Sequence, residues 1–185
     1  MIKLLICLST LFVAAICGCF DKGDKEIGGS CYKFVNQKLS FEDARDWCHY
    51  KNPVTMSYLA YVGNQFTANF LASYAHSEFG PAESFFWIGL SRNRTWMPWT
   101  WDTGYQAVFT NFGSDQLNQN YAAESITNTK WSSFNDSNTF NFVCSYDPSA
   151  PPTFGPPATV GPTGAPTTTT NGVTTPTVPT TTGKK

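Results

Sequence analysis

The sequence contains few charged residues and no concentrated run of either sign. Lys and Arg together number 12, Asp and Glu number 13, and the formal net charge is −1. No basic cluster exists that would neutralise a line of phosphates, which argues against nucleic acid as a partner. The same lack argues against electrostatic attachment to anionic lipid. The charge distribution therefore indicates no particular class of partner, and any ligand has to be bound mainly through uncharged groups.

Recognisable catalytic and metal-binding motifs are also missing. The sequence has no Gly-x-Ser-x-Gly element and no Cys-x-x-Cys spacing, and its two histidines, His49 and His76, are far apart. His49 directly follows Cys48 and is interpreted as a surface or packing residue rather than a general base. The sequence therefore predicts that the protein is not an enzyme.

Long hydrophobic runs are limited to the N-terminus. Lys3 is followed by uncharged, mostly apolar residues as far as Phe20, with small residues near the end of the run. This pattern is typical of a secretory signal peptide. An uncleaved anchor is the alternative, but the apolar stretch is shorter than the ~20 residues that span a bilayer. We expect a signal peptide at residues 1–18, cleavage near Cys17 or Gly18, and a secreted, extracellular protein without membrane insertion after cleavage.

Aromatic residues are nearly absent from the C-terminal part. All but one of the 29 Phe, Trp and Tyr residues precede Pro148, whereas nine of the 12 prolines lie from Pro148 onward. Because aromatic side chains supply the most buried apolar area, only the part before Pro148 can build a core. Residues 148–185 are rich in Thr and Pro, which predicts a disordered, mucin-like tail with O-linked sugars. An unglycosylated flexible tail is the alternative.

Six cysteines are present, and Cys7 and Cys17 belong to the predicted signal peptide. In the oxidising compartment that secretion implies, two disulfides are the expected state of the remaining four. Four cysteines allow three pairings, among which the sequence alone does not choose: Cys19, Cys31, Cys48 and Cys144.

Hydrophobic periodicity predicts two helices in the first half of the chain. Ser40 and Asp43 resemble a capping box, so a helix is expected to begin at Ser40. Its buried stripe is predicted to be Phe41, Ala44, Trp47 and Cys48. The second helix is expected over residues 64–76, with one apolar side formed by Phe66, Phe70, Leu71 and Tyr74.

Strand patterns occur before and after a long irregular stretch. Strands are predicted at residues 31–35, 85–90, 121–127 and 140–146, and residues 91–120 form a loop-rich region. Two early helices followed by strands indicate an α+β domain. A loop of this length within a compact domain is commonly functional.

Five short motifs occur in order along this part of the chain. They are Cys31-Tyr32-Lys33-Phe34, Phe41-x-x-Ala44-x-x-x-Cys48, Trp87-Ile88-Gly89-Leu90, Trp101-Asp102-x-Gly104 and Phe142-Val143-Cys144. Together they resemble the C-type lectin-like domain over residues 19–147. The resemblance implies an α+β fold in which two helices pack on antiparallel sheets, with a long loop region.

The resemblance also implies a disulfide pairing, namely Cys48 with Cys144 and Cys19 with Cys31. Many members have a further bridge across the long loop, whose cysteines would lie near Tyr121 and Asp136 in this sequence. Both cysteines are absent here. Loss of a bridge over a short loop removes ~3 kcal/mol of constraint, so the long loop is expected to be less restrained than in such relatives.

The calcium site of sugar-binding members is altered in this sequence. The family's Asn-Trp pair and ligand triplet correspond to Asn111-Phe112 and Gln116-Leu117-Asn118. Leu117 replaces a cis proline, and a cis bond before leucine is disfavoured by ~3 kcal/mol. The family's Trp-Asn-Asp triplet corresponds to Trp131-Ser132-Ser133, which lacks both ligands.

Calcium prefers six to eight oxygen ligands that include carboxylates, and only Asp115 and Glu124 offer charge nearby. The sequence therefore predicts no cofactor and binding without calcium, with Gln116, Asn118 and Glu124 as weak calcium candidates. Candidate ligand-binding residues are Asp115, Gln116, Asn118, Trp96 and Trp99. The two tryptophans are included because aromatic faces stack on sugars or anchor protein partners.

Two N-glycosylation acceptors are present, Asn93 in Asn-Arg-Thr and Asn135 in Asn-Asp-Ser. A glycan on Asn135 would crowd the altered calcium site. The resemblance implies a binding protein for glycans or for cell-surface and extracellular proteins, with a role in innate defence. The alternative is a structural or mucus-matrix glycoprotein without sugar-binding activity.

Overall fold

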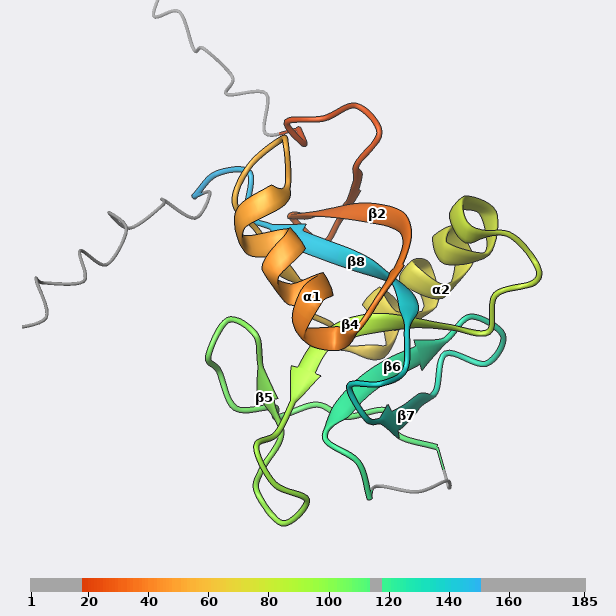
Figure 1. The fold of residues 1–185 in the computed structure, drawn as a ribbon. Coiled ribbons are helices and arrows are strands. Elements are labelled where there is room, and N and C mark those ends of the chain that lie inside the picture. The colour runs from red at the N-terminus through yellow and green to blue at the C-terminus, as the bar shows by residue number, and fades with distance from the viewer. Residues whose placement is uncertain (1–17, 114–117, 151–185) are drawn as a thin grey trace, which may run out of the picture. The chain divides into compact units, whose positions relative to one another are not determined.

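The structure is a computed structural model that describes residues 18–113 and 118–150. Its elements are shown in Figure 1. In chain order they are β1 (Lys25–Ile27), β2 (Ser30–Leu39), α1 (Phe41–Asp46), the π-helical turn η1 (Trp47–Lys51), β3 (Tyr58–Leu59), α2 (Gln65–Phe79), β4 (Phe85–Ser91), β5 (Thr100–Trp101), β6 (Tyr121–Ser125), β7 (Trp131–Phe134) and β8 (Phe140–Tyr146).

The strands form one mixed sheet rather than purely antiparallel sheets. The strand order is β1-β2-β8-β4-β6-β7, with β3 added to β8 and β5 added to β4. Strands β4 and β8 are parallel, and every other pairing between these strands of the described residues is antiparallel. The parallel pairing places the last strand between β2 and β4, so residues near both ends of the domain meet in the centre of the sheet.

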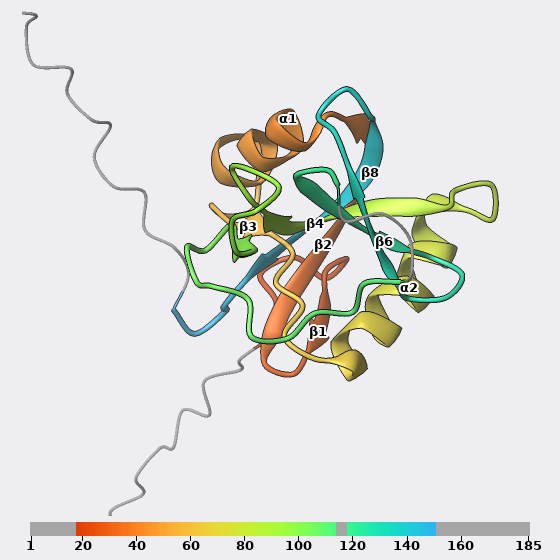
Figure 2. The ribbon, with the colours of Figure 1, turned by 90° about the horizontal axis from the view of Figure 1, so that it is seen from below.

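The two helices pack against different hydrophobic clusters on the sheet. Figure 2 shows α1 and α2 on opposite sides of the strands. The α2 cluster contains Leu71 and Phe86, whereas the α1 cluster contains Phe41 and Trp87. Because neighbouring residues of β4 point to opposite faces, Phe86 and Trp87 supply one ring to each cluster.

The predicted start of the first helix is confirmed. The Ser40 side chain accepts a hydrogen bond from the Asp43 N–H at 3.2 Å, and its hydroxyl donates to the Asp43 carboxylate at 3.0 Å. Phe41, Ala44 and Cys48 are buried as predicted, whereas Trp47 is only partly buried. The helix changes to a π-helical turn at Trp47.

The predicted apolar side of the second helix is wrong in part. Phe66 is 60% exposed and Phe70 is also exposed, and these two rings pack on each other with centroids 4.6 Å apart. The buried side combines small residues with two larger ones: Thr67, Ala68, Leu71, Ala72, Ala75 and Phe79. Small side chains let the helix approach the sheet closely, which a search for large apolar residues does not detect.

The predicted strands at residues 31–35, 85–90, 121–127 and 140–146 correspond to β2, β4, β6 and β8, with β6 ending at Ser125. Strand β7 was not predicted. It alternates between buried Trp131 and Ser133 and partly buried Ser132 and Phe134, and a buried serine hides this pattern from a hydrophobicity count.

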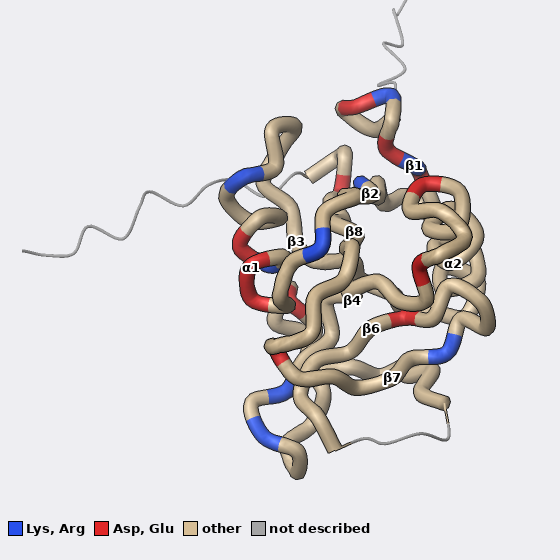
Figure 3. Tube along the Cα trace, turned by 45° about the vertical axis from the view of Figure 1, so that its right-hand side comes forward, with Lys and Arg blue, Asp and Glu red and all other residues tan. Residues whose placement is uncertain are grey.

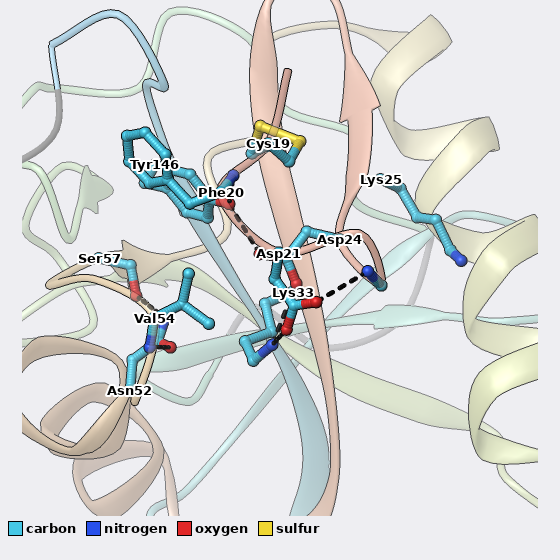
Figure 4. A network of polar contacts seen from close by, with 12 residues as sticks. Cys19, Phe20, Asp21, Asp24, Lys25, Lys33, Asn52, Val54, Ser57 and Tyr146 are labelled. Atoms are coloured by element: carbon cyan, nitrogen blue, oxygen red, sulfur yellow. Dashed lines mark hydrogen bonds and ion pairs between the residues drawn. A yellow bond between two sulfur atoms is a disulfide. The ribbon is translucent and has the colours of Figure 1, made fainter. Parts of the chain in front are cut away.

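Both disulfides implied by the resemblance are present, Cys19–Cys31 and Cys48–Cys144. Next to the first bridge, Phe20 stacks on Tyr146 with centroids 5.4 Å apart, and the Tyr146 hydroxyl donates to Asp24 Oδ2 at 2.8 Å (Figure 4). Lys33 Nζ contacts both Asp21 Oδ2 at 2.8 Å and Asp24 Oδ1 at 3.1 Å. These contacts hold the N-terminal hairpin against the end of β8.

Most of the predicted signal peptide and tail lies outside the described residues, and both assignments stay predictions. Within residues 18–113 and 118–150, no helix has the length and apolar character needed to cross a bilayer.

Candidate functional site

Trp131 is the residue on which the long loop region packs. Its side chain is completely buried in the α2 cluster. Three rings from the region of residues 91–120 meet it edge-on, with centroid distances of 5.8 Å for Trp101, 5.5 Å for Phe109 and 5.6 Å for Phe112. Edge-on aromatic contacts add ~0.5–1.5 kcal/mol each beyond simple area burial. The described part of the loop is therefore attached to the core by aromatic contacts with Trp131.

The loop backbone is joined to the same tryptophan. The Trp131 N–H donates to the Asn111 carbonyl at 3.0 Å, and the Gly113 N–H donates to the Trp131 carbonyl at 3.0 Å. The Asn111 side chain donates to the Thr129 carbonyl at 2.7 Å and accepts from Lys130 Nζ at 2.6 Å. Asn111 thus has a structural role between the loop and the β6–β7 turn.

Glu124 lies inside the core below this loop. It is 0% exposed, and its Oε2 accepts a hydrogen bond from the Trp131 indole N–H at 3.0 Å. Its Oε1 is buried without a hydrogen-bond partner among the described residues. Burial raises the pKa of Glu124 well above its usual range, and the indole donor opposes this shift to a smaller extent. The Glu124 carboxyl faces Trp131 in the protein interior, and its assignment as a weak calcium candidate stays a prediction.

The remaining candidate calcium positions are only partly described. Asp115 and Gln116 lie outside the described residues, and Asn118 is exposed. At the triplet that begins with Trp131, the Ser133 hydroxyl accepts a hydrogen bond from the Gln119 N–H at 3.2 Å. The Ser133 side chain therefore binds a backbone group of the chain itself. Assignment of Asp115, Gln116 and Asn118 as ligand-binding residues stays a prediction.

Other contacts are found at the positions where relatives have a second loop disulfide. The Tyr121 ring lies 4.5 Å from that of Phe41, and Asp136 Oδ1 accepts a hydrogen bond from the Glu42 N–H at 3.0 Å. Both contacts join the β6–β7 hairpin region to the first turn of α1. The hairpin is thus held by packing and one charge-assisted hydrogen bond.

The two candidate surface tryptophans differ in exposure. Trp96 is 75% exposed, and the Arg94 guanidinium lies 5.2 Å from its ring centroid. Trp99 is partly buried, and its ring centroid lies 4.8 Å from that of Phe112 and 4.4 Å from the Arg92 guanidinium. Figure 3 shows basic positions on the loop that leaves β4. Trp96 and Arg94 therefore form the exposed aromatic and basic part of this loop.

Both glycosylation acceptors have exposed asparagines. Asn93 borders a hollow of about 270 Å³ that is also lined by Arg45 and Arg92. Asn135 Oδ1 accepts hydrogen bonds from the N–H and the hydroxyl of Ser137. Their exposure is compatible with modification, which stays a prediction.

A tyrosine-lined pocket was missed by the sequence analysis. Its volume is about 440 Å³, and its lining includes Tyr58, Tyr61, Tyr105 and Tyr146. These residues come from distant parts of the chain, so no local motif joins them. The only sequence signal is the frequency of tyrosine near β3, after Trp101 and at the end of β8.

Comparison with known proteins agrees with this architecture. A family model for the lectin C-type domain matches residues 37–146, which is more than half of the chain. The chain belongs to the C-type lectin domain family. Domains of this family are generally not enzymes, they bind glycans or proteins, and they are commonly extracellular and disulfide-bonded.

Solved structures of several C-type lectin domains share the fold. Human lithostathine is 24% identical, with 72% of this chain and 93% of that chain covered and a TM-score of 0.62. Ovocleidin-17 of the Gallus gallus eggshell calcified layer is 25% identical, with 69% and 98% covered and a TM-score of 0.59. The carbohydrate-recognition domain of mouse scavenger receptor C-type lectin is 22% identical, with 70% and 98% covered and a TM-score of 0.59. A comparison with curated protein sequences finds no match.

Proposed function

We propose that the chain is a secreted, non-enzymatic binding protein whose C-type lectin domain recognises a carbohydrate or protein ligand without calcium. The observation that carries this proposal is a contrast between the core below the loop region and the surface of the loop. Glu124, which offers a carboxylate near the family's ion site, is buried against Trp131, whereas Trp96 projects into solvent beside Arg94.

The exposed loop residues have suitable chemistry for such a ligand. Trp and Arg are the residues most enriched among those that dominate binding energy at interfaces. An indole face also packs on the apolar face of a sugar ring, and a guanidinium donates in a fixed fork to carboxylate or sulfate oxygens. Trp96 and Arg94 thus suit a glycan with an acidic substituent or an acidic protein surface, and a role in innate defence belongs to the same proposal.

A glycan array with the purified full chain tests the proposal, run once with calcium and once with a chelator. We expect the same binding under both conditions. Trp96→Ala should lower the signal, whereas Tyr50→Ala should leave it unchanged, because Tyr50 is a similarly exposed aromatic residue at 70% on the η1 turn. Binding abolished by the chelator would contradict the calcium-independent mechanism. Absence of binding to glycans and to extracellular protein panels would favour the structural or mucus-matrix alternative.

A further inference from the structure

The tyrosine-lined pocket of about 440 Å³ includes neither Trp96 nor Arg94 in its lining. Four separate segments form it: the start of β2 at Ser30, β3 and the residues after it, the turn that follows β5, and the end of β8 with the residues after it. Its lining includes four tyrosines together with Thr103 and Asp147. A pocket of this volume lies within the range of small-molecule sites, which is ~300–1,000 Å³.

Hydrogen bonds hold the turn after β5 against β3. Asp102 Oδ2 accepts from the Leu59 N–H at 2.8 Å and contacts His49 Nε2 at 2.8 Å. The turn is closed by a hydrogen bond from the Gly104 N–H to the Trp101 carbonyl at 2.7 Å, with Gly104 at a φ of 89°. This geometry places Thr103 and Tyr105 beside Tyr58 and Tyr61 before any ligand binds.

The tyrosine rings are also fixed by their neighbours. Tyr61 packs edge-on against Trp101 at 5.0 Å, and a Cβ added at Gly63 would lie only 2.7 Å from the Tyr61 ring. Tyr58 packs edge-on against His49 at 5.2 Å. Tyr146 is held by Phe20 and Asp24, as Figure 4 shows. Burial, and secondly the hydrogen bond to Asp24, raise the pKa of Tyr146 to about 12, so this ring is neutral at physiological pH.

The described side chains that line the pocket carry negative charge and no positive charge. Of the described residues that line the pocket, none is Lys, Arg or His, and Asp147 carries the single carboxylate. Asp147 Oδ1 accepts from the Ser149 hydroxyl at 2.7 Å and from the Ser149 N–H at 2.8 Å. These bonds lower the pKa of Asp147 and keep it ionised, while Oδ2 receives no hydrogen bond from a described residue.

We propose that this pocket binds a small organic cation of the quaternary ammonium class. Aromatic faces attract such cations through the ring quadrupole, and grouped aromatic residues are a recurrent site for them. Tyr58, Tyr61 and Tyr105 provide the faces, and Asp147 provides the complementary charge. Three such rings and one carboxylate predict weak binding, with a dissociation constant on the order of millimolar or weaker.

Choline chloride is the probe, and titration of the full chain followed by NMR measures its binding. The control ligand is 3,3-dimethyl-1-butanol, which has the same shape with carbon in place of the charged nitrogen. We expect saturable binding of choline and at least tenfold weaker binding of the neutral isostere. Equal binding of both ligands, or binding of glucose in place of choline, would overturn the proposal in favour of an uncharged ligand.

Two variants and one matched control locate the site. Tyr105→Leu and Asp147→Asn should each weaken choline binding about two- to fivefold, the effect of one exposed cation–π contact or ion pair. Tyr105 is 74% exposed, so its replacement leaves the core intact. Tyr50→Leu, at a similarly exposed tyrosine outside the pocket, should have no effect. Unchanged choline binding in Tyr105→Leu would refute this location.

Sedimentation with phosphatidylcholine vesicles separates two sources of the same headgroup. Capture that is lost in Tyr105→Leu would support the ammonium chemistry and identify a membrane lipid as the source. Binding of free choline without vesicle capture would support a soluble ligand. These results do not depend on the glycan array, because Trp96 and Tyr105 belong to separate surfaces.

Discussion

Strands β2 and β8 and the loop region of residues 91–120 are stabilised by different means. Each of the two strands contains a cysteine of a disulfide, and Lys33 on β2 forms ion pairs with Asp21 and Asp24. The described part of the loop region is instead packed on Trp131 through aromatic rings, and Trp131 donates to the buried Glu124. The two strands depend on covalent bonds. The loop region depends on aromatic packing and on the protonation state of the buried Glu124 carboxyl.

This difference indicates which conditions act on each region. A reducing agent acts first on the strands, because their bridges constrain the unfolded chain. A change in pH acts first on Glu124 below the loop. Its effect on stability arises because burying a charged carboxylate is far less favourable than burying a neutral carboxyl group. The proposal of calcium-independent binding therefore requires that protein groups such as Trp131 support the loop in place of an ion.

The largest effect is expected from removal of the longer disulfide. Cys48 and Cys144 are 96 residues apart, and Cys19 and Cys31 are 12 apart. The loop-entropy model gives about 4.7 kcal/mol for the first bridge and about 2.8 kcal/mol for the second. Urea unfolding of the two double Cys→Ala variants measures both values. A greater loss from the N-terminal bridge would show that local contacts, rather than chain entropy, control the stability of the strands.

Replacement of the tryptophan below the loop is expected to have the next largest effect. Trp131→Phe leaves an aromatic ring but removes the indole donor, so the Glu124 carboxyl keeps no hydrogen-bond partner among the described residues. The cost is about 1–3 kcal/mol in free energy of unfolding. Trp96→Phe is the matched control and should change stability very little, because Trp96 is exposed. Similar losses in both variants would contradict the role assigned to Trp131.

Glu124 predicts a dependence of stability on pH. Burial raises the pKa of Glu124 well above its ordinary value of 4.5, so above that pH the folded state retains a proton that the unfolded state has lost. The contribution of this group is therefore fully present below pH 4.5 and is lost as the pH rises through the folded pKa, with a slope of at most ~1.4 kcal/mol per pH unit. Urea unfolding over a pH series should show this decline in the wild type and a flatter profile in Glu124→Gln. Identical profiles would refute the buried proton.

A smaller effect is expected at the start of α1, which packs beside the longer disulfide. Ser40→Ala removes the bond to the Asp43 N–H and should lower the free energy of unfolding by about 1 kcal/mol. Ser40→Thr keeps the capping oxygen and should recover most of the loss. Equal destabilisation by Ala and Thr would show that the cap is not the stabilising contact.

The fold could be predicted from the sequence where local chemistry decides it. The Ser40 cap and the buried Trp87-Ile88-Gly89-Leu90 segment of β4 were both foreseen, since each depends on residues close in sequence. The buried side of α2 was foreseen only at Leu71, because Ala68, Ala72 and Ala75 pack through their small size and give a weak hydrophobic signal.

The candidate sites could be predicted less well, because they depend on which face a side chain takes in the folded sheet. Glu124 was a weak calcium candidate on account of its charge, and the register of β6 places this fully buried residue on the same face as Ala122, in the α2 cluster. The tyrosine-lined pocket combines β3, the turn after β5 and the end of β8, which only the three-dimensional structure brings together.

Thermal unfolding of the full chain in calcium and in chelator tests the central claim most directly. The account predicts the same midpoint in both solutions, because Trp131 and Glu124 support the loop without an ion. A ligand bound at a hundred times its dissociation constant would add ~2.7 kcal/mol to the stability of the folded state. A midpoint several degrees higher in calcium would therefore contradict the account.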